Sequence, residues 1–324
     1  MMLLRFSPFE MFLLRGSSSI LLEMFNVIDI ITLMTLSKCS KALRRLFICY
    51  AQAKWDPAKR YRRWFSDVLE FRRVLRRSGA VISGSFALQY FDRSFYAESD
   101  MDLFVRIGGV GPLCEFIRSQ GYASVGHSHD YDECVAEGGA HIIKAALNIT
   151  SFEDPLLGVY TFQKFVVWAS GRVDMLQVQV VVVDTEPIEH ILFDFHSTAV
   201  MNFLTADNAI SVFPLSTFVH RVSYISKVRT ESTRRTEAWI SKYEARGFKV
   251  IGSCNSEEAR HVASGFRYAG DSMSWKIGLF EDKEAERGVY GPPMLGVGFE
   301  VLVRDNLAVK NDSYLRIAEP FMWR

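Results

Sequence analysis

The sequence predicts an α+β protein, with a mixed sheet flanked by helices and a separate helical module at the N-terminus. Three observations support this fold class. Apolar residues follow helical spacing near the N-terminus and again over residues 61–77. Short apolar segments at 80–83 and 101–105 have the composition of buried strands. Residues 172–183 are too β-branched for a helix, and the turn at 169–171 indicates a hairpin with residues 162–168.

Composition places the chain among globular proteins that carry no strong overall charge. Of the 324 residues, 49% are hydrophobic and 13% aromatic, which excludes disorder over most of the length. Lys and Arg number 38 against 37 Asp and Glu, for a net charge of +1, so any binding to nucleic acid must come from a local patch. The five cysteines form no C-x-x-C pair, which argues against a disulfide framework and a structural zinc site.

The sequence gives no sign of a membrane span or a signal peptide. Its most apolar stretch, residues 19–36, contains Glu23, Asn26 and Asp29, whose burial in lipid would cost several kcal/mol. Near the N-terminus, Arg5 and Glu10 interrupt a short apolar run. With the unpaired cysteines, this predicts an intracellular protein, cytoplasmic or nuclear, with no membrane partner.

Residues 1–56 form the expected N-terminal module, in which Asp29 caps a helix from residue 30 to about 47. About 40 residues here resemble an F-box, on the residues Pro8, Glu10, Leu22, Met24, Phe25, Ile28, Asp29, Ile30, Ile31, Leu33, Leu36, Ser37, Lys38, Cys39, Ser40, Lys41 and Leu43. The resemblance implies a Skp-type adaptor as a partner of residues 8–50. An ordinary helical hairpin packed on the next domain explains the same apolar pattern.

Residues 57–205 form the expected core domain. It opens with an amphipathic helix over 61–77, whose arginines at 62, 63, 72, 73, 76 and 77 give a solvated outer face or a phosphate contact. A strand, a helical turn and a second strand follow, then a helix at 112–119 and the hairpin. Residues 187–248 are expected to be mainly helical. Residues 206–324 form a helical and mixed α/β extension packed on the core.

The chemistry of the chain concentrates at the strand-to-helix turn of Gly84 and Ser85 and at the later strand that carries Asp100 and Asp102. A Gly-Ser turn lets the backbone approach a phosphate, and the helix start supplies amide donors. The two aspartates are two residues apart, so a strand points both carboxylates to one face. Paired carboxylates suit a hard cation such as Mg²⁺ that also binds substrate phosphates.

This constellation resembles the polymerase-beta-like nucleotidyltransferase superfamily, over roughly residues 60–270. The runs from Arg73 to Ser85 and from Phe193 to Asn202 are similar to a fungal group with this core. The resemblance implies that Gly84 and Ser85 bind the triphosphate and that Asp100 and Asp102 hold Mg²⁺ or Mn²⁺. It also implies a third acid on a later strand, catalytic and metal-binding, for which Asp174 is the natural candidate.

The third-acid position depends on the register of the hairpin strand. If the register shifts, Gln177 or Gln179 takes the place of Asp174, and an amide cannot act as a base or complete a two-metal site. With the acid in place, the resemblance implies transfer of a nucleoside monophosphate from a nucleoside triphosphate to a hydroxyl of RNA, a small molecule or a protein. The alternative is a non-catalytic F-box-type adaptor with a degenerate nucleotidyltransferase domain.

Two other groups of polar residues are weaker candidates. His127, His129, Asp130 and Asp132 offer metal-binding side chains, but an exposed polar loop explains them without a cysteine or histidine partner at a motif spacing. His196-Ser197-Thr198 has no Gly-x-Ser-x-Gly elbow and is expected to be a packing or capping element.

Overall fold

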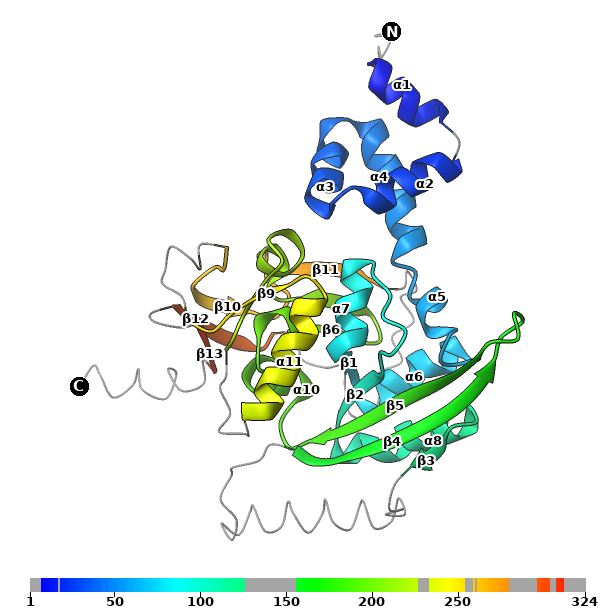
Figure 1. Ribbon diagram of the computed structural model, residues 1–324, viewed down its shortest axis with the longest axis vertical. Coiled ribbons are helices and arrows are strands. Elements are labelled where there is room, and N and C mark those ends of the chain that lie inside the picture. The colour runs from blue at the N-terminus through cyan, green and yellow to red at the C-terminus, as the bar shows by residue number, and fades with distance from the viewer. Residues whose placement is uncertain are drawn as a thin grey trace, which may run out of the picture.

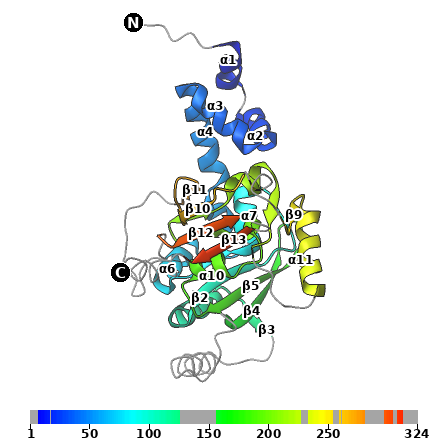
Figure 2. The same cartoon turned by 90° about the vertical axis from the view of Figure 1, so that its left-hand side faces the viewer.

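The computed structural model of the chain describes residues 7–16, 18–125, 156–226, 233–253, 259, 261–279, 296–303 and 307–311. It is a mixed α and β structure built around one large sheet, with the helical module at one end (Figures 1 and 2). Cys39, Cys49 and Cys114 are free thiols, and Cys134 and Cys254 lie outside the described residues. Within the described part of the chain, no helix has the length and apolar character needed to cross a bilayer.

The large sheet has eight strands in the order β11-β7-β6-β1-β2-β5-β4-β3. Neighbours pair antiparallel except β2 and β5, which are parallel. The strands are β1 (Val81–Ser83), β2 (Met101–Arg106), β3 (Ala123–Val125), β4 (Leu156–Val167), β5 (Val173–Val183), β6 (Asn202–Leu204), β7 (Asn208–Ser211) and β11 (Trp275–Gly278). The sequence-predicted strands and the long β4–β5 hairpin are therefore present.

The main core lies between this sheet and three helices: α6 (Val68–Ser78), α7 (Gly84–Asp92) and α8 (Val110–Ser119). Phe71, Leu103 and Val178 are fully buried in it. A second core contains Ile191 of α10 (Pro187–Phe193) and Phe299 of a small sheet, seen in Figure 2. That sheet consists of β10 (Gly265–Tyr268), β12 (Gly298–Val303) and β13 (Leu307–Asn311). The remaining elements are the parallel pair β8 (Val222–Tyr224) and β9 (Lys249–Ile251), and helix α11 (Thr233–Ala245).

The N-terminal module stands apart from the sheet in Figure 1 and contains α1 (Pro8–Arg15), α2 (Ser18–Val27), α3 (Ile30–Cys39) and α4 (Lys41–Lys54). Ser7 and Glu10 form a capping box on α1, and Asp29 caps α3 by accepting from the amide of Thr32 at 2.9 Å. The cap predicted at Asp29 is confirmed by this bond. The short helix α5 (Pro57–Tyr61) then leads into the core.

Several expected element boundaries are corrected. The helix expected from 30 to 47 ends at Cys39, because Ser40 caps a new helix through the amide of Leu43. The helix expected over 61–77 is divided in the same way, because the side chain of Asp67 caps α6. Caps of this kind accept hydrogen bonds from the first amides of a helix, which have no partner within the helix. They therefore favour the start of a new helix even where the apolar pattern of the sequence continues without a break.

The segment at 187–248 is only partly helical, because short strands β6, β7 and β8 lie between α10 and α11. Strands β7 and β11 belong to the large sheet although they follow residue 205. The boundary expected at residue 205 therefore runs through the sheet, and the segment after it completes the core as well as packing on it.

Candidate functional site

The candidate site begins at the turn that joins β1 to α7. Ser83 is extended, Gly84 has φ +66°, and α7 begins at Gly84. A positive φ favours glycine, since a Cβ would be strained there. No side chain caps the start of α7. The first amides of this nine-residue helix are left without a side-chain acceptor, which suits an anion.

Asp102 lies directly against this turn. In the antiparallel pairing of β1 with β2, Ser83 is opposite Asp102. A Cβ added to Gly84 would lie only 2.2 Å from Oδ2 of Asp102, so the absence of a side chain at Gly84 is what gives the carboxylate its place. The strand and the turn that the sequence singled out therefore meet, with the Asp102 carboxylate beside the start of α7.

Asp100 lies just before β2 and is oriented by a chain of amide side chains. Gln177 Nε2 donates to Asp100 Oδ2 at 2.9 Å, and Gln163 Nε2 donates to Gln177 Oε1 at 2.7 Å. In the parallel pairing of β2 with β5, Asp102 is beside Gln179. Residues two apart on a strand share a face. The two aspartates and the two glutamines Gln177 and Gln179 accordingly lie on the same side of the sheet.

Burial and mutual repulsion favour the protonated forms of the pair. Burial raises the pKa of Asp102 to about 7, the Asp100 carboxylate adds to the rise, and the Lys242 ammonium opposes it. Burial also raises the pKa of Asp100, while the bond from Gln177 and the charge of Lys242 lower it. A buried carboxylate pair of this kind is stabilised by a cation placed between its oxygens.

Helix α11 brings cations to the site from about 140 residues further along the chain. Arg246, just after α11, donates from Nη1 to Ser85 Oγ at 3.0 Å, and its guanidinium lies 4.1 Å from the ring centre of Tyr96. Lys242 is close enough to both aspartates to shift their pKa values. No sequence pattern marks these two residues, because a Lys and an Arg four residues apart at the end of a helix match any solvated face.

The structure does not bring Asp174 to the pair, so the expectation that it supplies the third acid is corrected. Its carboxylate accepts from Trp168 Nε1 at 2.9 Å and from Arg172 Nε at 2.8 Å, and lies 3.7 Å from Arg63. It precedes Gln179 by five residues on β5, about 16 Å along an extended strand, and an odd spacing places the two on opposite faces. The register places amides, Gln177 and Gln179, where the third acid would be.

The donor set fits a single hard cation. Two carboxylates are oxygen ligands of the kind that Mg²⁺ and Mn²⁺ accept, with substrate phosphates and water completing the coordination. Across the described ranges, no cluster of three or more His, Cys, Asp and Glu side chains could hold a metal ion. With only two acids, the arrangement does not support the two-metal site that the resemblance implies.

The other predicted residues lie away from this site or outside the described chain. The His127, His129, Asp130 and Asp132 candidate falls outside the described residues. The ring of His196 stacks on Trp239 at 3.9 Å and its Nδ1 is 2.9 Å from Ser197 Oγ, consistent with the packing role expected of it.

The F-box-like residues are divided between core and surface. Phe25 is buried in the main core, Leu36 is half-buried, and Ile31 is 40% exposed. The side chain of Leu22 lies outside the described set. The module also exposes Phe9, Phe12, Ile20, Val27, Met34 and Ile48. Packing on the next domain therefore accounts for the buried apolar residues of the module. The exposed ones give the module an apolar surface.

Comparisons with protein-family models, curated proteins and solved structures give no match for this chain. Its function is therefore argued from its own residues.

Proposed function

We propose that the turn at Gly84–Ser85 and the pair Asp100–Asp102 bind a nucleoside triphosphate with a divalent cation and transfer its nucleoside monophosphate to a hydroxyl acceptor. The observation that carries this proposal is the contact of the Asp102 carboxylate with Gly84, where a Cβ would lie 2.2 Å from Oδ2. This contact supports the proposal because a carboxylate able to hold a cation lies beside a turn that suits phosphate, as in the polymerase-beta-like nucleotidyltransferases that the sequence resembles.

The chain supplies the phosphate contacts from three elements. The first amides of α7 and the hydroxyl of Ser85 donate to the β- and γ-phosphates. Arg246, held at 3.0 Å from Ser85 Oγ, adds a guanidinium that suits phosphate oxygens, and Lys242 adds a positive charge close to both aspartates. Together they hold the triphosphate so that its α-phosphorus faces the carboxylate pair.

Asp100 and Asp102 are the residues that would hold Mg²⁺ or Mn²⁺, and Gln177 fixes the orientation of Asp100. When bound, such an ion supplies positive charge that stabilises the α-phosphoryl transition state. The hydroxyl oxygen of the acceptor forms a bond to the α-phosphorus and its proton passes to water. The bond from the α-phosphorus to the oxygen that bridges to the β-phosphate breaks, and pyrophosphate leaves.

A second function is favoured by the amides at the third-acid position. Because Gln177 and Gln179 cannot act as a base, the domain would bind nucleotide without transferring it. The chain would then be a binding protein or an F-box-type adaptor, with residues 8–50 contacting a Skp-type partner through exposed residues such as Ile31.

One experiment separates these functions. The full chain is incubated with each labelled nucleoside triphosphate, Mg²⁺ or Mn²⁺, and a pool of RNA, small-molecule and protein acceptors. We expect label transfer by the wild type and a fall of roughly a thousandfold or more in the Asp100→Asn/Asp102→Asn variant, since several kcal/mol of transition-state stabilisation are lost. Glu98→Gln, which removes an exposed carboxylate two residues before Asp100, is the matched control and keeps full activity.

Thermal unfolding with the same nucleotides and metals completes the test. A ligand bound only by the folded chain stabilises it by about 2.7 kcal/mol at 100 times its Kd. Transfer that persists in the double variant would reject these aspartates as the catalytic pair. Stabilisation without transfer would favour the non-catalytic function, and neither stabilisation nor transfer would reject a nucleotide site altogether.

A further inference from the structure

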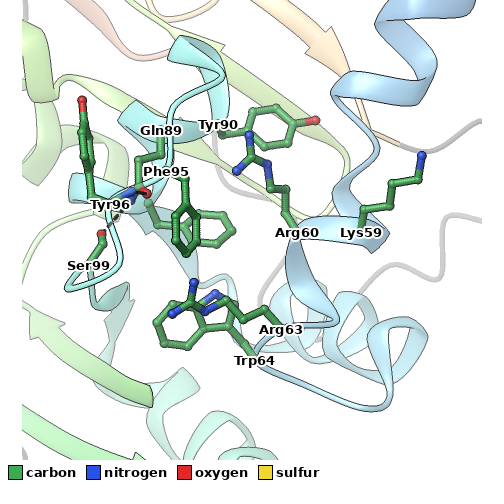
Figure 3. A pocket seen from close by; sticks show the side chains of 10 residues that line it. Lys59, Arg60, Arg63, Trp64, Gln89, Tyr90, Phe95, Tyr96 and Ser99 are labelled. Atoms are coloured by element: carbon green, nitrogen blue, oxygen red, sulfur yellow. Dashed lines mark hydrogen bonds between the residues drawn. The ribbon is translucent and has the colours of Figure 1, made fainter. Parts of the chain in front are cut away.

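Two adjoining cavities are lined by residues of α5, which lies near the end of the β4–β5 hairpin in Figure 1. Figure 3 shows the smaller of the two. One, of about 210 Å³, lies between α5, α7 and the loop that leads to Asp100. The other is an open groove of about 570 Å³ that extends to the hairpin turn. Lys59 and Arg63 line both, so the cavities form one continuous surface, here called the basic groove.

The basic groove carries a concentrated positive charge on a chain whose net charge is only +1. Its lining includes five cations and no acid: Lys59, Arg60, Arg62, Arg63 and Arg172. Among the described residues, the acid that contacts them is Asp174, which pairs with Arg172 and lies 3.7 Å from Arg63. Most of the charge is therefore left for an anion to neutralise.

Two of these arginines are held in place with donors still available. Arg60 Nη1 donates weakly to the carbonyl of Ser94 at 3.4 Å, and no ion pair with a described carboxylate accompanies it. Arg63 Nε is buried and has no hydrogen-bond partner among the described residues. Burial lowers the pKa of both guanidinium groups. The Arg63 side chain as a whole is 18% exposed, so its other nitrogens, and not the enclosed Nε, are the donors that an anion in the groove would contact.

Aromatic rings alternate with the cations along the basic groove. Phe95 is 57% exposed and lies 4.6 Å from the guanidinium of Arg63. In Figure 3, Phe95 is at the middle of the smaller cavity, with Trp64 and Arg63 on one side of it and Gln89 and Tyr90 on another. Trp168 of the hairpin lines the open part. Exposed rings beside cations are what stacked bases and their phosphates require.

The basic groove is linked to the candidate site through Ser99 and Gln89. Ser99, the neighbour of Asp100, lines the smaller cavity together with Gln89. Gln89 Nε2 donates to the carbonyl of Ser85 at 3.0 Å and to Ser99 Oγ at 2.7 Å, so it joins the cavity wall to the phosphate-binding turn. A strand bound in the groove would have its end next to Asp100.

We infer that the basic groove binds single-stranded nucleic acid, with phosphates on its cations and bases on Phe95 and Trp168, and presents a terminal hydroxyl to Asp100 and Asp102 as the acceptor. The acceptor role rests on the proposed function, whereas binding does not. The cavity of about 210 Å³ is smaller than the roughly 300–1,000 Å³ typical of small-molecule sites, and it continues into an open groove. A chain of nucleotides fits this shape better than a compact metabolite.

Binding is measured by fluorescence anisotropy with a labelled 15-nucleotide oligo(U), in EDTA and without nucleotide, so that neither metal nor catalysis contributes. The test variant is Lys59→Gln/Arg62→Gln/Arg172→Gln, which replaces three exposed cations of the groove. The matched control, Arg73→Gln/Arg77→Gln/Arg118→Gln, removes the same charge from exposed positions on α6 and α8. A second pair compares Phe95→Ala with Phe266→Ala, which are 57% and 65% exposed in the wild type.

We expect the groove variant to bind at least tenfold more weakly than the charge-matched control. Its slope of log Kobs against log salt should also be shallower by about 2, for three lost phosphate contacts at about 0.7 each. Phe95→Ala should weaken binding about tenfold and Phe266→Ala should not, because a stacked base contributes about 1–3 kcal/mol. Single-stranded DNA of the same length should bind through the same residues, and a duplex should bind more weakly.

Equal losses in the two charge variants, no binding at low salt, or equally tight binding of poly(Glu) would each overturn the inference. The last result would assign the groove to acidic proteins. If the oligonucleotide binds but no nucleotide is transferred to it, binding by the groove is supported and the proposed transferase activity is rejected. If transfer occurs to other acceptors while the oligonucleotide does not bind, the transferase stands and the groove inference fails.

Discussion

At the scale of single residues, the main cost of the site is the burial of Asp102. Burial raises the pKa of this carboxyl from 3.8 to about 7. Between these two pH values the carboxyl is protonated in the folded chain and ionised in the unfolded chain. Stability therefore falls as the pH rises from about 4 to 7, because ionising the buried group opposes folding. Under the proposed function, a bound cation would offset this cost.

The first prediction is that Asp102→Asn stabilises the free protein at pH 8. The amide keeps the shape of the side chain and removes the buried charge. We expect a gain on the order of 2 kcal/mol in the free energy of unfolding, allowing for the solvent contact the side chain retains. The fall in stability between pH 4 and 7 should also become smaller. Urea titrations across that range measure both effects. A variant less stable than the wild type at pH 8 would contradict the burial argument.

At the scale of elements, the β1–α7 turn and β2 depend on each other. Gly84 is required by its φ of +66° and by the Asp102 oxygen that occupies the space of a Cβ. Gly79 has nearly the same backbone conformation, φ +67°, but no atom within 4 Å of an added Cβ. Substitutions at the two glycines therefore separate the effect of the left-handed backbone conformation from the effect of the contact with Asp102.

The second prediction compares Gly84→Ala with Gly79→Ala. Each pays roughly 1–2 kcal/mol for a side chain in the left-handed region. Gly84→Ala must also displace Asp102, so we expect it to be less stable than Gly79→Ala by about 2 kcal/mol or more and to lose nucleotide binding. Urea unfolding gives the difference. In an Asp102→Ala background the extra cost should disappear, and equal costs for the two glycines in the wild-type background would show that the contact is not tight.

At the scale of the whole molecule, the helical module is tied to the core at the end of α7. Arg93, with φ +56°, donates to the carbonyls of Phe25 and Ile28, both at 2.9 Å, and to the hydroxyl of Tyr50 at 3.0 Å. Trp55 Nε1 donates to the carbonyl of Tyr90 at 3.0 Å. Helix α7 begins at the Gly84–Ser85 turn and ends at the module, so one element joins the candidate site to the module.

The third prediction is that Arg93→Ala loosens the module without unfolding the sheet. Losing three hydrogen bonds from a charged group should cost on the order of 3 kcal/mol in docking, or roughly a hundredfold in the equilibrium. Hydrogen exchange should then accelerate over residues 18–54 and stay slow in β2 and β5. Arg221→Ala is the matched control, since Arg221 has φ +55° and donates to Asp92 and to the carbonyl of Arg246, neither of which belongs to the module. Unchanged exchange over 18–54 would mean that other contacts hold the module.

The sequence by itself determined what depends on short stretches of chain. The β4–β5 hairpin follows from β-branched residues around a glycine turn, the cap at Asp29 from side-chain chemistry, and the Gly84–Ser85 turn from the only residue that suits its backbone. The shared face of Asp100 and Asp102 follows from the period of a strand, which holds wherever the strand pairs. These features required no knowledge of distant contacts.

Only the tertiary structure decided which distant residues complete the site. The parallel register of β2 with β5 joins segments more than 70 residues apart and places Gln179, not Asp174, beside Asp102. A shift along such a strand changes its partners without changing its apolar pattern every second residue, so the sequence left both choices open. Lys242 lies close enough to the aspartates to shift their pKa values, and Arg246 donates to Ser85 Oγ. Strands β7 and β11 extend the sheet past residue 205. These contacts depend on packing between distant segments of the chain, which no local sequence pattern indicates.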